Sequence, residues 1–445
     1  MFSKLTMKTT ALGLGAAALA LSLAACSSNA SAPASSTAAS SSASSAPSSS
    51  MATMDHSTMA SSSAAAAAAA LVPVGTGDPF ADAMTAASHM PMTGKTLADG
   101  IVKAAGIKGD PDSDAAGLRA ALTSNLQEHV YLAGIGVATA YTKGADSAEF
   151  KAAAAAIDKN AVALADMVGT LDPKMKDPVL KVWRAHIGYF VDYAVAAKKG
   201  DKAGKEKAQA ELSQYTKDAG AALSALAKGK ISAGDVTEGL VHHVASLSEA
   251  IDALAAGKTE AYSKLHAAAS HGGDFIAKLA NALAVGNGVK GDALDAASTL
   301  RTTLATGLQE HVYLASVAVF VAYTSEGGTD SEAFKAAAGA LDHNSQALAE
   351  AIGSVAGKEK QEAFLTLWRE HIGYFVDYAN AVAKGDKAAA TKALEELNEY
   401  RPKAGAFFEE ISKGELKADA IATGLGEHVT TLAGAIDSLK KALVG

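Results

Sequence analysis

Eight of the twelve histidines form four pairs at matching positions of two similar stretches of sequence. The pairs are His89 with His271, His129 with His311, His186 with His371, and His243 with His428. A buried imidazole that lacks a partner for a ring nitrogen costs about 1–3 kcal/mol. Inward-facing histidines on facing helices are also how helical bundles build metal and cofactor sites. Four such histidines in each stretch therefore predict a bound ion.

Local spacing supports the inward orientation of these side chains. Trp183 lies three residues before His186, while Phe190 and Tyr193 lie four and seven residues after it. All four share one side of a helix at 100° per residue. For any single position, however, a hydrogen-bonded core histidine is the more common explanation, and a tandem repeat retains packing residues too.

Polar residues near the histidines could support either interpretation. Asp158 and Asn160, together with nearby tyrosines, could orient imidazole N–H groups, as could their counterparts in the second stretch. Glu128 and Glu310 lie about 100° around the helix from the neighbouring histidine. We expect these two glutamates to flank the site or to reach solvent, and solvent is the favoured expectation.

Methionines are concentrated near the first paired histidine. Six of the ten lie between residues 51 and 92, where some accompany His56 and others accompany His89. Thioether and imidazole ligands together suit Cu(I). The segment 51–59 is either a copper site of its own or neutral sequence. The further candidate ligands of the folded part are Met84, Met90, Met92 and His266, which replaces Met84 in the second stretch.

The matching stretches are copies of one repeat. The phrase WRAHIGYFVDYA at 183–194 returns as WREHIGYFVDYA at 368–379, and other shared phrases recur 182 to 185 residues apart. Such self-similarity marks a duplicated unit. We therefore expect two tandem copies, from about 79 to 258 and from about 259 to 445.

Each copy has apolar residues at intervals of three and four and almost no strand pattern. The expected fold is all-α, with two tandem antiparallel bundles of about six helices each joined by short turns. The sequence leaves open whether the first helix of a copy packs in its own bundle or bridges the two. In the first copy, helices are expected near 80–105, 113–142, 147–169, 175–198, 201–228 and 232–256.

The N-terminal residues have the pattern of an export signal. Residues 1–26 carry two lysines, an apolar run and small residues before Cys26. Their LAAC ending resembles the bacterial lipobox, which implies cleavage before Cys26 and lipid attachment to its sulfur. The Ser/Ala-rich residues 27–78 are expected to form a flexible linker. The predicted location is therefore outside the cytoplasmic membrane, anchored by lipid at the cell envelope.

Composition excludes several partners and cofactors. Cys26 is the one cysteine, so no internal disulfide, cysteine-based metal site or covalently attached haem c is expected. The formal net charge of -8 argues against a nucleic-acid partner. Contact with a membrane is expected only through the lipid anchor, and the sequence does not indicate a protein partner.

The phrases LQEHVYLA and HIGYFVDYA, with SHMPMTGKTLADGI at 88–101, resemble a group of secreted bacterial helical-repeat proteins. Genome annotation often labels this group "copper amine oxidase". The resemblance covers residues 79–445. Copper amine oxidases themselves use an Asn-Tyr pair, a His-x-His copper motif and a large β-sandwich, none of which this sequence contains. The resemblance therefore does not imply oxidase activity.

We favour a lipid-anchored, extracytoplasmic metal-binding protein that buffers, delivers or senses copper through its inward histidines. No nucleophile, paired carboxylates or phosphate-binding loop accompanies them, so we expect binding rather than an enzyme. One alternative is a surface interaction or structural module with ordinary core histidines. Another is a bundle that binds haem, a diiron centre or another transition metal, although the paired Glu-x-x-His motifs of diiron bundles do not occur here.

Overall fold

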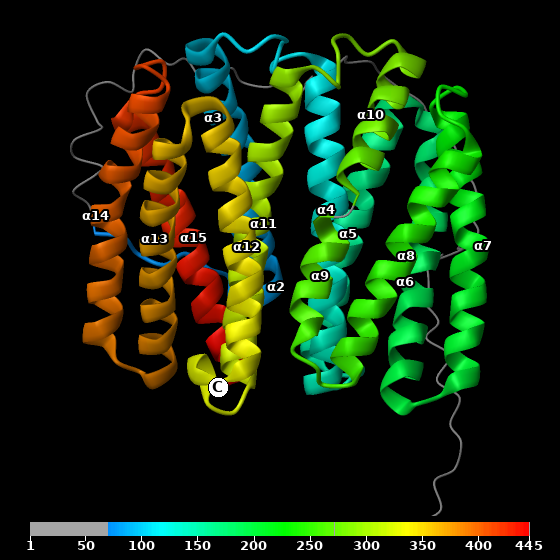
Figure 1. The fold of residues 1–445 in the computed structure, drawn as a ribbon. Coiled ribbons are helices and arrows are strands. Elements are labelled where there is room, and N and C mark those ends of the chain that lie inside the picture. Colours follow the sequence, from blue (N-terminus) through cyan, green and yellow to red (C-terminus); the bar gives the residue numbers. More distant parts are fainter. Residues whose placement is uncertain (1–69, 271, 445) are drawn as a thin grey trace, which may run out of the picture. The chain divides into compact units, whose positions relative to one another are not determined.

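The computed structural model describes residues 70–270 and 272–444, and within these ranges the chain is helical and contains no strand (Figure 1). This confirms the predicted all-helical class. The predicted signal, the lipid-bearing Cys26, most of the linker with its segment 51–59, and His271 lie outside the described residues.

Both repeats contain the same series of helices, and turns with serine or aspartate caps begin most of them. The helices of the first repeat are α2 (Pro79–Ser88), α3 (Met90–Ala105), α4 (Asp114–Lys143), α5 (Ala148–Leu171), α6 (Lys176–Lys199), α7 (Lys202–Leu226) and α8 (Ala233–Ala255). Those of the second are α9 (Glu260–Ser270), α10 (Gly273–Asn287), α11 (Ala296–Thr324), α12 (Glu332–Ala356), α13 (Lys358–Lys384), α14 (Lys387–Ile411) and α15 (Ala418–Leu443). Short 3₁₀ turns precede α6 and α12, at Pro173–Met175 and Gly328–Asp330.

The single helix expected near 80–105 is instead two helices. His89 ends α2 and precedes α3, and Pro91 occupies the first turn of α3. Proline has no N–H to donate to the carbonyl of Ala87 four residues earlier, so a helix running through this point would lose a hydrogen bond. At the start of a helix that N–H has no intrahelical partner in any case, and proline is well tolerated there.

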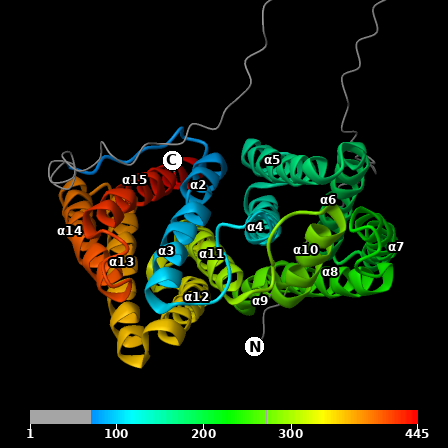
Figure 2. The same cartoon turned by 90° about the horizontal axis from the view of Figure 1, so that it is seen from above.

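The first two helices of each repeat pack against the other repeat. Helix α3 lies along α11 and α2 lies along α15, whereas α9 contacts α8 and α4, and α10 contacts α4. Figure 2 shows α2 and α3 beside α11 and α15. We call α4–α10 the first helix group, and α2, α3 and α11–α15 the second helix group. The sequence left open whether the first helix of a copy packs in its own bundle. In the structure, the first helices of each copy pack in the group formed by the other copy.

One glycine explains why the two exchanged pairs pack differently. A Cβ atom on Gly94 would lie 2.4 Å from the backbone nitrogen of Ala305, so only glycine lets α3 approach α11 this closely. Ile276 occupies the equivalent position of α10, whose contact with α4 is less extensive. The two repeats therefore differ in how closely α3 packs on α11 and α10 packs on α4.

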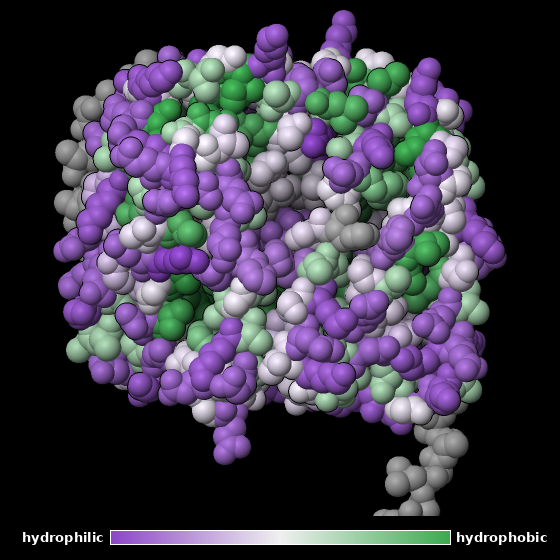
Figure 3. Space-filling view, viewed as in Figure 1, coloured by the Kyte–Doolittle hydropathy of each residue, from purple (hydrophilic) through white to green (hydrophobic). Residues whose placement is uncertain are grey.

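Helices α4 and α11 pack against each other and join the two helix groups. Helix α11 is long and apolar enough to cross a membrane, with a mean hydropathy of 1.3, but 83% of its most apolar window is buried within the protein. Its composition is that of a central core helix, because a helix that is apolar all round is buried. Figure 3 shows mainly hydrophilic side chains on one outer face, with small scattered hydrophobic patches.

The last part of the predicted linker, residues 70–78, lies against α15. The N–H of Val74 donates to the carbonyl of Thr430 at 2.9 Å. The buried carboxylate of Asp82 accepts hydrogen bonds from the backbone and hydroxyl of Thr76 and from the hydroxyl of Ser438. These bonds hold the start of the described chain against the second helix group.

Candidate metal centres

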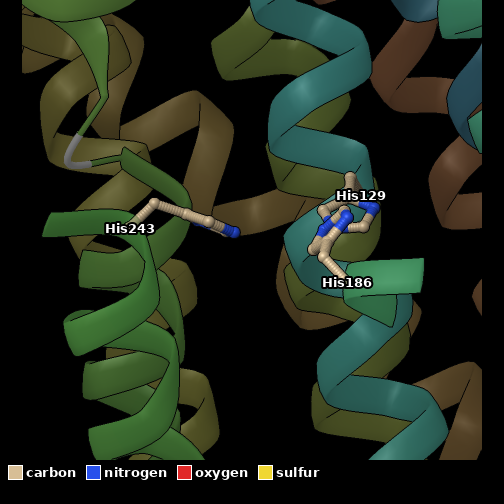
Figure 4. A group of neighbouring side chains, drawn as sticks. All are labelled: His129, His186 and His243. Atoms are coloured by element: carbon tan, nitrogen blue, oxygen red, sulfur yellow. The ribbon is translucent and has the colours of Figure 1, made fainter. Parts of the chain in front are cut away.

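Three histidines from three helices of the first group meet in its interior. His129 of α4 and His186 of α6 place their Nε2 atoms 3.2 Å apart. His243 of α8 points toward this pair (Figure 4), and one ring nitrogen from each of the three lies within 4.8 Å of the others. His129 and His186 are 2% and 0% exposed, and His243 is partly buried. These three residues form the first triad.

Aromatic rings enclose the first triad. Trp183, one turn before His186, lies 4.6 Å from its ring and 5.0 Å from that of His129, between centroids. Tyr215 of α7 stacks on His186 at 4.4 Å, and Phe190 contacts His186 and His243 by its edge. The spacing of Trp183, Phe190 and Tyr193 around His186 thus reflects a buried helix face, as predicted.

The second group repeats this arrangement at the matching residues. The Nε2 atoms of His311 in α11 and His371 in α13 are 3.2 Å apart, and His428 of α15 completes a set whose ring nitrogens lie within 4.8 Å of one another. All three are buried. Trp368 lies 4.4 Å from the ring of His371, on which Tyr400 stacks at 4.9 Å. These three histidines form the second triad.

Burial keeps the triad imidazoles uncharged. It lowers the pKa of His129 and of His311 to about 3, with His243 adding repulsion at His129, and it lowers the pKa of His243 to about 4. Desolvation first, and the neighbouring histidines second, lower the pKa of the remaining members well below the usual range. These members are His186, His371 and His428. At neutral pH each ring therefore offers a nitrogen lone pair, which is the form that binds metal.

The distance between the paired Nε2 atoms of each triad fits metal coordination. Two nitrogen ligands at about 2.0–2.1 Å from a tetrahedral ion lie about 3.3 Å apart, close to the observed 3.2 Å between paired Nε2 atoms. The same distance suits one imidazole donating to the other, so it does not separate the two interpretations by itself. Several ring nitrogens have no hydrogen-bond partner within the described residues. They are His243 Nε2, both nitrogens of His428, and Nδ1 of His129, His186, His311 and His371.

The predicted supporting role of Asp158 and Asn160 is wrong. Asp158 is exposed and pairs with Arg184, with the guanidinium Nε donating at 2.7 Å. Asn160 donates to the carbonyl of Asn125 and to the carboxylate of Glu128, and contributes no bond to an imidazole. Asp342 and Asn344 behave in the same way in the second repeat, since they bond to Arg369 and Glu310. The triads are therefore held mainly by packing against aromatic rings.

The expectation that Glu128 and Glu310 reach solvent is also wrong, because both lie where α4 packs on α11. Tyr131 of α4 donates to Glu310 at 2.8 Å, and Tyr313 of α11 donates to Glu128 in return. The two tyrosine rings stack 5.8 Å apart. Each glutamate immediately precedes a triad histidine, so this reciprocal pair of bonds connects the helices that carry His129 and His311.

The pKa values of the Glu128 and Glu310 carboxyl groups are shifted in opposite directions. Burial raises the pKa of Glu128 despite the hydrogen bonds that it accepts. Burial acts in the same direction on Glu310, but His266, whose Nε2 lies 3.6 Å away, together with Tyr131 and Asn344, lowers its pKa overall. His266 was a predicted metal ligand, and the structure places it beside Glu310 instead.

The remaining predicted ligands lie around the second triad or away from it. The ring of His89 lies 6.3 Å from that of His428, between centroids, outside the compact set of three. Its Nε2 is buried with no hydrogen-bond partner among the described residues, and burial lowers its pKa. Met90 is 3% exposed, whereas Met92 is 65% exposed. Met84 packs at the edge of the core.

Comparisons with protein-family models, with curated proteins and with solved structures found no match to this chain. The two triads are therefore the features of the described residues that indicate a function. Each could hold a metal ion, and neither the metal's identity nor its role follows from the fold.

Proposed function

We propose that the protein binds two metal ions, one in each histidine triad, and that copper is the ion. The observation that carries the proposal is the formation of the same buried three-imidazole set twice, from matching residues of the two repeats. In each set, one neutral nitrogen from each ring lies within 4.8 Å of the other two, so a modest inward shift of the third ring would bring all three to ligand distance from one ion.

The cost of unpartnered ring nitrogens favours a metal ion in each triad over histidines that only pack against their neighbours. A buried ring nitrogen without a partner costs about 1–3 kcal/mol, and the described residues leave such nitrogens in all six rings. An ion held by the paired Nε2 atoms would also give a partner to Nε2 of His243 or of His428, which have none among the described residues. One ring cannot bind the same ion through both of its nitrogens, so the Nδ1 atoms of the paired rings gain no bond from it.

The ligand set favours copper, in particular Cu(I). No carboxylate or cysteine belongs to either triad, so three neutral imidazoles bring no negative charge to balance the ion. Burying an unbalanced charge is costly, and a monovalent ion carries less of it than a divalent one. Among the ions that imidazole binds well, copper alone is stable both as a monovalent and as a divalent ion. Cu²⁺ also binds nitrogen ligands more tightly than the other divalent first-row metals do.

The proposed setting is the cell envelope, with the chain anchored through lipid on Cys26 and the ion buffered, delivered or sensed there. This part depends on the sequence pattern of residues 1–26 and on the resemblance to secreted helical-repeat proteins. We propose binding without catalysis, since each triad consists of histidines alone, with no carboxylate or cysteine in the set.

Metal counting tests the proposal directly. His186→Leu and His371→Leu should each lower the copper bound per chain by one, and the double variant by two. Comparing variants with the unaltered chain matters, because methionines of the segment 51–59 could bind copper as well. Equal copper content in all four proteins would refute the proposal.

Fluorescence identifies which triad is filled. The chain has two tryptophans, and each lies against one triad. In Trp183→Phe, quenching on copper addition reports the second triad alone, and in Trp368→Phe it reports the first. Quenching that persists after His371→Leu in the Trp183→Phe background would contradict binding at the second triad.

A further inference from the structure

A cavity of about 170 Å³ lies beside the second triad. His371, His428 and Trp368 line its buried side, and Met90 and Thr93 of α3 line it from the exchanged helix pair. A single water molecule needs only about 15 Å³ measured in this way. The cavity therefore has room for a molecule considerably larger than water in contact with two triad imidazoles.

The cavity connects the second triad with solvent. Its lining runs from the buried imidazoles to Thr96, Ala420 and Gly424, all of which are exposed. Helices α3 and α15 carry these three residues, so the opening lies between an exchanged helix and the helix that carries His428. A molecule can thus reach the triad without unfolding of a helix.

A single aromatic ring distinguishes the first helix group at this position. Thr93 of α3 corresponds to Phe275 of α10, and Gly424 of α15 corresponds to Gly239 of α8. A Cβ atom on Gly239 would lie 2.5 Å from the ring of Phe275, whereas a Cβ on Gly424 would meet nothing within 4 Å. Phe275 therefore fills in the first group the space that is hollow in the second.

Coordination chemistry indicates that this cavity could admit a further ligand to a metal ion in the second triad. Three protein ligands leave one position of a four-coordinate ion open to water or to another molecule, whereas closed sites hold the ion for structural purposes. Two imidazoles of the second triad line the cavity, so a molecule in the cavity would lie beside an ion held there. At the first triad, the ring of Phe275 packs over the equivalent approach.

We propose that the second centre, and not the first, binds an exogenous donor molecule at its metal ion through this cavity. The ligand class is a small, largely apolar molecule of azole size that carries one nitrogen or sulfur donor. Aliphatic and aromatic side chains dominate the lining, and its polar groups apart from the histidines are two threonine hydroxyls, the Tyr400 hydroxyl and the indole N–H of Trp368. The inference rests on the proposed binding of metal in both triads.

The test uses the full chain loaded with Cu(II) and titrated with imidazole, read by the visible absorption and electron paramagnetic resonance of the copper. In the unaltered chain, one of the two centres should shift. Thr93→Phe, which copies the first group, should abolish the shift with copper content unchanged. Phe275→Thr, the matched opposite change, should make the other centre respond as well.

Met90 is an internal donor that could compete with an added ligand, because its side chain lines the same cavity. A response that appears only in Met90→Leu would mean that Met90 itself fills the open position, and it would overturn the proposal.

The remaining outcomes separate this inference from the proposed function. Two bound coppers with no imidazole response in the unaltered chain would refute the inference and leave metal binding intact, whereas no bound copper would refute the proposed function.

Far-UV circular dichroism and copper content verify folding of each variant. Thr93→Leu, a smaller change, should weaken the response if Thr93→Phe does not fold, and an unweakened response would count against the cavity as the route.

Discussion

Acid should destabilise the metal-free chain through the triad histidines. Unfolded histidine has a pKa near 6.5, whereas burial lowers the pKa of His129 and His311 to about 3 in the folded protein. Below pH 6.5 the unfolded chain therefore binds protons that the folded chain does not. Stability from these groups is fully present above pH 6.5 and is lost as the pH falls toward 3.

The magnitude follows from the distance between the two pKa values. At pH 5, each of these histidines is about 1.5 pH units below its unfolded pKa, which corresponds to about 2 kcal/mol. His129 and His311 together thus remove about 4 kcal/mol, a large part of the 5–15 kcal/mol typical of a folded domain. The other triad members act in the same direction. Glu128 offsets part of the loss, because its raised pKa favours proton uptake by the folded state.

The assay is urea unfolding of the chain in excess chelator at pH 7 and at pH 5, followed by circular dichroism. His129→Leu/His311→Leu should reduce the difference between the two pH values by about 4 kcal/mol. Equal free energies of unfolding at both pH values in the unaltered chain would refute the view that the triads are buried and neutral.

Two further substitutions test packing outside the triads. Tyr131→Phe should lower the free energy of unfolding by about 1.5–3 kcal/mol, because buried Glu310 loses a charge-assisted hydrogen bond. The copper content should not change in this variant. A changed copper content would show that the contact of α4 with α11 shapes the triads. Val179→Phe copies Phe364 of the second repeat and fills an apolar cavity of about 50 Å³ in the first group. At about 24 cal/mol per Å³ it should stabilise the chain by up to about 1 kcal/mol in thermal or urea unfolding, and a clear loss would mean that the cavity cannot admit the ring.

The sequence predicted the repeat, most helices and the inward position of the six triad histidines, because those features follow from sequence spacing. His186 illustrates this, since its three aromatic neighbours fix its helix face before any tertiary contact is considered. The predicted set of four ligands per repeat was less successful. His89 lies next to His428 of the other repeat, because α3 packs on α11 and α2 packs on α15, a long-range choice that local spacing does not encode.

The buried glutamates could not be placed by periodicity alone. Glu128 lies 100° from His129 and so points away from the first triad, but α4 is enclosed on a second side by α11. A helix with apolar residues on all faces indicates such double burial, and the sequence from Leu126 to Val137 has this character. That signal, rather than distance around the helix, indicates that Glu128 is buried, whereas its partner Tyr313 follows only from the packing of α4 on α11.

The exchange of helix pairs has an implication for the ancestry of this chain. In the tandem protein, the helices that cover each triad's group come from the other copy, so a single repeat in the same geometry would need a second molecule to supply α2 and α3 or their equivalents. Two chains would then donate these helices reciprocally. Fusion of two such genes, joined by the short turn between α8 and α9, converts an intertwined pair into one chain whose halves no longer need to find each other. It also frees the two copies to diverge, as Thr93 and Phe275 have done.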